Sequence, residues 1–182
     1  MHYHTLLTGL EWFFWGLWIF AVLLVISWGL SVLFGAPYLP TFKTQQAQAL
    51  DLLDLKPGQV FVDLGSGDGT LLALAASRGL NAVGYEINPF LVVFTWLRTR
   101  RYGRLVKVRL ANFWLCDLSY ADGIFVFLIN HRMRHLDRFM TKAAAKKPIK
   151  LASNSFKIPN KKPAKRLGPI FLYEYGPLAR RG

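Results

Sequence analysis

Apolar residues run almost without interruption from residue 12 to residue 34, and no charged residue occurs between Trp12 and Phe42. As a helix, the stretch 12–34 would be about 34 Å long, enough to cross the hydrocarbon core of a bilayer. Tryptophans cluster at its start and one recurs at Trp28, which is typical of membrane interfaces. The pattern predicts a short tail over 1–11 followed by one transmembrane helix.

Two other interpretations of the apolar stretch are a cleaved signal peptide and a buried helix of a soluble domain. The signal peptide fits poorly, because residues 1–11 carry no Lys or Arg and the apolar run is too long. Basic residues begin only after the stretch, with Lys43 and Lys56. The expected orientation therefore places the C-terminal side in the cytoplasm of a prokaryote, or in the matrix if the protein is mitochondrial.

After a linker over 35–42, the pattern changes to short β-branched runs that alternate with stretches of helical periodicity. This alternation predicts one α/β domain over 43–182, Rossmann-like, with a mainly parallel sheet, helices on both faces and abbreviated C-terminal strands. The expected helices are 44–55, 70–78, 89–100 and 132–145, and the expected strands are 60–64, 81–86, 105–110, 123–129, 149–155 and 169–175.

The first strand of this domain ends in an acid that is followed by alternating glycines. Glycines at a turn from strand to helix allow positive φ angles and let a ligand lie against the backbone. Dinucleotide-binding folds use G-x-G-x-x-G, whereas the third glycine comes one residue earlier here. A purely structural turn is the alternative. The candidate ligand-binding residues of this loop are Asp63, Gly65, Ser66, Gly67, Asp68 and Gly69.

A second carboxylate, Glu86, ends the next predicted strand, about 20 residues after the glycine turn. A carboxylate at this strand tip is placed to accept both hydroxyls of a ribose, although it could also be an ordinary solvated acid. Asn88 and Pro89 then begin another helix, with the asparagine as its cap. We expect Glu86 and Asn88 to belong to the same nucleoside site as the loop.

The acid two residues before G-x-G-x-G, together with Glu86, resembles the first two motifs of the class I S-adenosyl-L-methionine methyltransferases. The resemblance implies S-adenosyl-L-methionine as methyl donor and a sheet that usually has seven strands. The linker 37–41 and the runs 62–69 and 82–92 are similar to the membrane-anchored lysine methyltransferases of mitochondria and their prokaryotic relatives. That family modifies the ATP synthase c-subunit and the adenine nucleotide translocase, so a protein substrate bearing a lysine is implied.

Two positions depart from the family pattern. Asn112 stands where the family has an acid that contacts the adenine, and an amide can still hydrogen-bond to the adenine edge. After the fourth predicted strand the chain has Asn130-His131-Arg132-Met133 in place of an apolar run. The candidate catalytic side chains nearest the methyl group are Tyr38, Thr41 and Asn130, with Tyr38 equally suited to anchor at a membrane interface.

Charge suggests further partners. The net charge is +13, and the stretch 142–166 contains nine Lys or Arg residues and no acid. Anionic lipid is the expected partner of this stretch, a solvated face is an alternative, and nucleic acid is unlikely. His131 and His135 have a zinc-compatible spacing without an evident third ligand, so no metal is expected. The rival functions are a methyltransferase for a lipid, quinone or other small hydrophobic acceptor, and a non-catalytic membrane protein with this fold.

Overall fold

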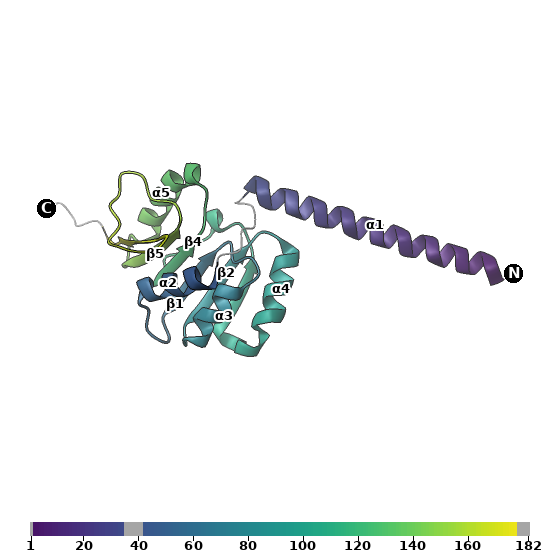
Figure 1. Ribbon diagram of the computed structural model, residues 1–182, viewed down its shortest axis with the longest axis horizontal. Helices are drawn as coiled ribbons and strands as arrows, with labels where there is room; N and C mark the ends of the chain where they lie inside the picture. Colours follow the sequence, from purple (N-terminus) through teal and green to yellow (C-terminus); the bar gives the residue numbers. More distant parts are fainter. Residues whose placement is uncertain (1, 35–41, 178–182) are drawn as a thin grey trace.

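The computed structural model describes residues 2–34 and 42–177, with side chains of the first helix described for residues 10–26 and 29. Helix α1 (His2–Phe34) projects from an α/β domain (Figure 1). Among the described residues, no helix has both the length and the hydropathy of a membrane span. The predicted helix over 12–34 is confirmed, because this stretch lies within α1. The interpretation of this stretch as a transmembrane helix is not supported.

The domain is built on one seven-stranded sheet with the strand order β3-β2-β1-β4-β5-β7-β6. The first five strands run parallel, and the last two are antiparallel to their neighbours. Because β1 lies beside both β2 and β4, the strand order reverses there, and ligands of such sheets bind beyond the carboxyl ends of the strands at this point. The strands are β1 (Val60–Leu64), β2 (Asn81–Glu86), β3 (Val106–Leu110), β4 (Gly123–Val126), β5 (Ile149–Asn154), β6 (Lys165–Leu167) and β7 (Ile170–Tyr175).

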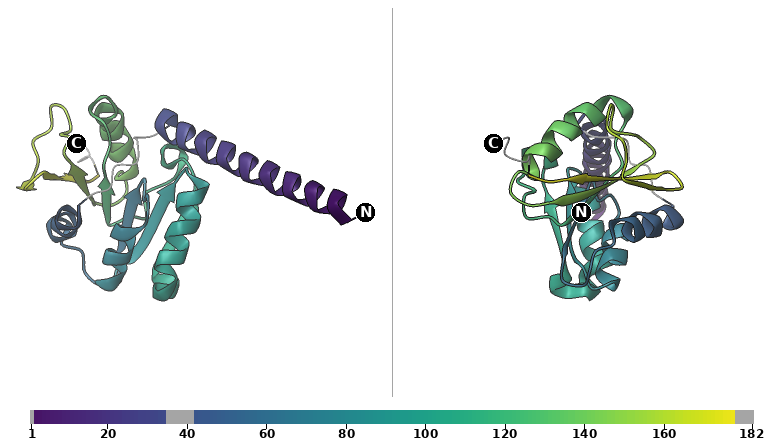
Figure 2. Two further views of the ribbon diagram at one scale, coloured as in Figure 1. Left: turned by 45° about the vertical axis from the view of Figure 1, so that its right-hand side comes forward. Right: turned by 90° about the vertical axis from the view of Figure 1, so that its left-hand side faces the viewer.

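Helices cover both faces of the sheet, as the alternation of elements predicts (Figure 2). One face packs against α2 (Lys43–Leu53) and α3 (Thr70–Ser77), with Phe61 and Phe125 in the shared core. The other face packs against α5 (Met133–Ala143), with Val62 and Ile124 in the shared core. Successive strand residues therefore enter opposite cores, which is why the central strands are nearly continuous apolar runs.

The remaining elements are α4 (Pro89–Thr99) and three short 3-10 turns, η1 (Arg100–Leu105), η2 (Phe113–Leu115) and η3 (Asn130–Arg132). The predicted abbreviation of the C-terminal strands holds for β6, which has three residues, and not for β7, which has six. The sequence pattern did not predict β6, because Lys165 and Arg166 give no apolar alternation. The predicted strand 123–129 ends at residue 126, where the chain turns toward η3.

Candidate functional site

The glycine loop begins where β1 ends and leads directly into α3. Gly65, Gly67 and Gly69 have φ angles of 90°, 53° and 75°, a region that side chains with a Cβ rarely adopt. The amides of Gly65 and Ser66 both donate to the Tyr85 carbonyl oxygen, at 2.9 and 3.0 Å. These bonds hold the loop against the carboxyl end of β2, where the sheet topology expects a ligand.

Two residues that the sequence pattern did not single out support this loop. The Thr95 hydroxyl donates to the Gly67 carbonyl oxygen at 2.8 Å, and a Cβ at Gly69 would lie 2.3 Å from Thr95 Cγ2. Gly84 lies on β2 beneath the loop, where a Cβ would lie 2.7 Å from Ser66 Oγ. A glycine inside a strand often marks such a close approach, so Gly84 could have been found from the sequence, whereas Thr95 carried no signal.

Glu86 is buried and binds the backbone around it. One carboxylate oxygen accepts from the Gly67 amide at 3.0 Å, and the other accepts from the amides of Ile87 and Asn88, both at 2.9 Å. The side chain therefore links the end of β2 to the glycine loop. Two carboxylate oxygens offer about four acceptor positions, and these three bonds leave capacity for one further donor such as a ribose hydroxyl.

Asp63 is buried at the end of β1, beneath the loop. Burial, followed by the negative charges of Glu86 and Asp68, raises the pKa of its carboxyl well above the usual range. A ligand that brings positive charge to this place favours the ionised carboxylate again. The negative charges of Glu86 and Asp68 beside Asp63 disfavour an anionic ligand at this loop.

Three polar residues predicted at the ligand make local backbone contacts in the structure. Asp68 accepts from the amide and hydroxyl of Thr70 at the start of α3, and it pairs with Arg98 at 2.8 Å. Asn88 caps α4 by accepting from the Phe90 amide at 3.0 Å, which confirms the predicted cap. Asn112 caps η2 by accepting from the Trp114 amide at 3.1 Å. Their contacts with a cofactor stay predictions.

Of the three candidate catalytic residues, the structure describes only Asn130. Asn130 is exposed at the start of η3, shortly after β4. Tyr38 and Thr41 lie outside the described residues. Their assignment to the methyl acceptor side stays a prediction.

Several cations of the basic stretch 142–166 bind internal groups. Lys147 Nζ lies 2.9 Å from an Asp122 carboxylate oxygen, and Lys150 Nζ donates to the Leu53 carbonyl oxygen at 2.8 Å. Lys161 Nζ lies over the Tyr175 ring, 3.4 Å from its centroid. These contacts give part of the stretch a role in stability, and its contact with lipid stays a prediction.

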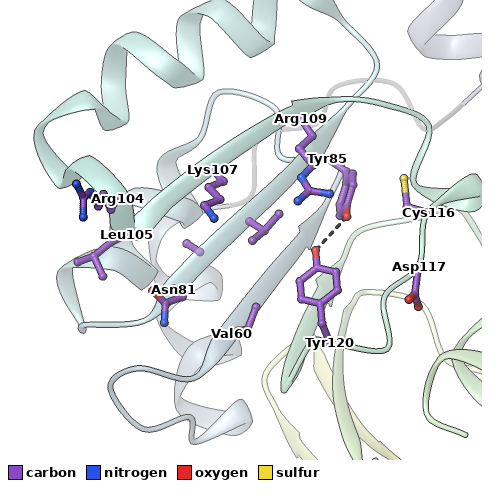
Figure 3. Close-up of a pocket in the computed structure, with 12 residues that line it drawn as sticks. Val60, Asn81, Tyr85, Arg104, Leu105, Lys107, Arg109, Cys116, Asp117 and Tyr120 are labelled. Carbon is purple, nitrogen blue, oxygen red and sulfur yellow. Dashed lines mark hydrogen bonds between the residues drawn. The ribbon is translucent and has the colours of Figure 1, made fainter. Parts of the chain in front are cut away.

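A hollow of about 560 Å³ lies on the face of the sheet that α3 does not cover (Figure 3). It exists because the connection from β3 to β4 contains only η2 and no helix long enough to cover β1 to β3. Tyr85 and Tyr120 meet in it through their hydroxyls at 3.0 Å, and Arg104, Lys107 and Arg109 line it. None of the glycine-loop residues lines this hollow, so it is separate from the predicted cofactor site.

The residues present at the loop fit a nucleoside cofactor with positive charge. A Cβ at Gly65 would meet nothing within 4 Å, so the backbone there is open to a ligand. A seven-stranded sheet in this order, with a glycine loop after β1 and a carboxylate after β2, defines a class I methyltransferase fold. An RNA methyltransferase from Salinibacter ruber, crystallised with S-adenosyl-L-homocysteine, matches with a TM-score of 0.66 and 26% identity over 75% of this chain and 92% of that chain.

The model of the family described as ANTKMT methyltransferase domain matches residues 63–165, more than half of the chain. The chain belongs to this methyltransferase family, which confirms the predicted resemblance and, with it, S-adenosyl-L-methionine as the methyl donor.

The curated relatives carry lysine methyltransferase names. The ATP synthase c-subunit lysine N-methyltransferase of Xenopus laevis is 34% identical over 104 residues, which are 56% of this chain and 46% of the relative. The adenine nucleotide translocase lysine N-methyltransferase of Mus musculus is 33% identical over 137 residues, 72% of this chain and 58% of the relative. The chain thus spans about half the length of the curated relatives that it matches.

Proposed function

We propose that this protein transfers a methyl group from S-adenosyl-L-methionine to a lysine side chain of a membrane or membrane-proximal protein. The observation that carries the proposal is the glycine loop, held between the buried carboxylates Asp63 and Glu86 at the carboxyl ends of β1 and β2. The lysine specificity rests on the names of the two relatives described above.

In this proposal the residues of the loop hold the donor. S-adenosyl-L-methionine supplies an activated methyl group, so the protein needs no covalent nucleophile. Asp63 lies buried beneath the loop, Glu86 offers its remaining acceptor position, and the backbone at Gly65 is open to close approach. These residues orient the methyl donor and keep it in place.

The acceptor must be a neutral amine when it attacks, and a lysine side chain in water has a pKa of about 10.4. An apolar surrounding favours the neutral form, because burial penalises the charged one. Asn130, exposed beyond β4, is the described side chain that we place beside the acceptor. Tyr38 and Thr41 are the partners proposed from the linker.

We also propose that α1 attaches the protein to a membrane. Apart from Glu11, its described side chains are apolar or glycine, and most are exposed, among them Trp12, Phe14, Trp18 and Leu23, each at least half exposed. A helix that is apolar on all sides is stable only where it is buried in protein or in lipid. The basic residues that follow α1 favour placing the catalytic domain on the cytoplasmic side, or on the matrix side in a mitochondrion.

The test is methylation of membranes with labelled S-adenosyl-L-methionine, followed by mass spectrometry of the modified residue. We expect label on a lysine of a membrane protein, and we expect its loss in the variants Asp63→Ala and Glu86→Ala. Glu174→Ala is the matched control, because Glu174 is an exposed acid on β7. Label in the organic extract, or undiminished labelling by the two site variants, contradicts the proposal.

A further inference from the structure

Helix α4 buries polar residues and exposes large apolar ones, unlike an ordinary surface helix. Its two buried residues are threonines, Thr95 and Thr99. Large apolar side chains point outward instead, with exposed fractions of 57% for Val93, 48% for Phe94, 61% for Trp96 and 46% for Leu97. A contiguous exposed apolar patch of this kind marks an interaction site.

The inner side of α4 is polar because it serves the cofactor loop. Thr95 donates to the Gly67 carbonyl oxygen, and Thr99 donates back to the Thr95 carbonyl oxygen, both at 2.8 Å. The inward threonines are thus explained by the site. The site does not explain why Trp96 and Leu97 point outward, because neither side chain packs in the described hydrophobic core.

Cations border this apolar surface. From Ile87 to Cys116 the chain has six cations and no acid. Arg98 pairs with Asp68, whereas no ion pair within the described residues engages Arg100, Arg101 or Arg104. Lys107 and Arg109 of β3 line the hollow on the opposite face of the sheet and are not part of this border (Figure 3). An apolar helix face with a basic border is the pattern of helices that lie in the headgroup region of an anionic bilayer.

The position of α1 agrees with this pattern. Phe20 of α1 and Phe90 of α4 meet edge to face, with ring centroids 5.7 Å apart. The two helices run crosswise, and α1 projects from the side of the domain along which α4 lies (Figures 1 and 2). A membrane that receives α1 along its axis therefore meets α4 lengthwise.

We propose that the outer face of α4, consisting of Val93, Phe94, Trp96 and Leu97 with the border Arg100, Arg101 and Arg104, docks the catalytic domain onto an anionic phospholipid surface. This inference rests on the membrane contact proposed for α1 and extends it to the domain. Docking through α4 holds the cofactor loop at a constant height above the bilayer, because Thr95 joins the helix to the loop.

The experiment uses the full chain with Cys116→Ser and one new cysteine that carries a nitroxide. Label positions are Leu97→Cys on α4, Leu17→Cys on α1 as the lipid reference, and Arg138→Cys on α5 as the aqueous reference. Vesicles of phosphatidylcholine are compared with vesicles that also contain phosphatidylglycerol. Collision with oxygen and with a water-soluble nickel complex reports whether each label lies in lipid or in water.

In anionic vesicles we expect the label at position 97 to collide less with the nickel complex and more with oxygen, as the label at position 17 does. The label at position 138 should stay in water. The triple variant Arg100→Gln/Arg101→Gln/Arg104→Gln should return the label at position 97 to water, whereas the label at position 17 should stay in lipid. Stabilisation by S-adenosyl-L-methionine verifies that each variant is folded.

A label at 97 that stays in water while 17 lies in lipid overturns the docking of α4 and leaves the role of α1 intact. Protection of 97 without vesicles, together with a doubled mass in analytical ultracentrifugation, also overturns it and assigns the face to a second copy. Lysine methylation is measured separately, so a failure of the proposed enzymatic activity is distinguishable from both results.

Discussion

Replacing Glu86 by glutamine tests whether this side chain organises the cofactor loop. The carboxylate accepts from three backbone amides, at 3.0 Å from Gly67 and 2.9 Å from Ile87 and Asn88. A glutamine amide has only one acceptor oxygen, and its NH2 group must face at least one of these amide donors. The shape of the side chain is otherwise unchanged, so the effect isolates the hydrogen bonds.

The magnitude follows from the bonds that are lost. A hydrogen bond to a charged group contributes about 1.5–3 kcal/mol, and an unsatisfied buried donor costs about 1–3 kcal/mol. We expect Glu86→Gln to lower the free energy of unfolding by about 3 kcal/mol. It should also abolish the added stability that S-adenosyl-L-methionine confers, about 2.7 kcal/mol at a hundredfold excess over Kd.

The assay is urea unfolding of the full chain in mild detergent, with and without S-adenosyl-L-methionine. Glu174→Gln, which changes an exposed acid on β7, serves as the control and should unfold like the original protein. If Glu86→Gln unfolds at the same urea concentration as this control and is still stabilised by the cofactor, the linking role of Glu86 is refuted.

Three further substitutions test the loop and its surroundings. Gly69→Ala should lower the free energy of unfolding by about 2–4 kcal/mol, because it combines a positive φ with overlap on Thr95; Gly58→Ala, which has a positive φ and open space, should cost only about 1–2 kcal/mol in the same urea titration. For Asp63 the folded-state pKa is raised, so the folded protein binds more protons and stability falls as pH rises above about 3.9. Asp63→Asn should remove this fall when unfolding is measured across pH, and an unchanged slope would show that Asp63 is not its source. Asn88→Ala should lower the free energy of unfolding by about 1 kcal/mol, because it removes the cap of α4. An unchanged free energy of unfolding would show that this cap does not contribute to stability.

Much of the site could be predicted from the sequence because it depends on local chemistry. The glycine positions specify a turn with positive φ angles, and a carboxylate near the carboxyl end of each of two parallel strands specifies that both lie at one edge of the sheet. Asn88 before Pro89 was readable as a helix cap, and the structure has that cap. These features need only residue type and spacing.

Other features depend on residues that are distant along the chain. Thr95 supports Gly67 from 28 positions away, and nothing in its own neighbourhood indicates this contact. Strand β6 forms because β7 provides a partner, since its own residues are exposed and two of the three are basic. The sheet order in particular is decided by packing against two cores, and no local pattern encodes it.

Residue type and spacing were enough to specify the glycine loop, the two acids and the apolar first helix, since each follows from the preferences of nearby residues. Contacts between distant segments were needed to show that the carboxylate of Glu86 binds the loop backbone, and that the apolar side chains of α4 face outward while its threonines face the loop. The physical reason is that α4 must satisfy the buried carbonyl of Gly67, which requires a hydroxyl on its inner side. Four large apolar side chains of the same helix, Val93, Phe94, Trp96 and Leu97, lie at the surface.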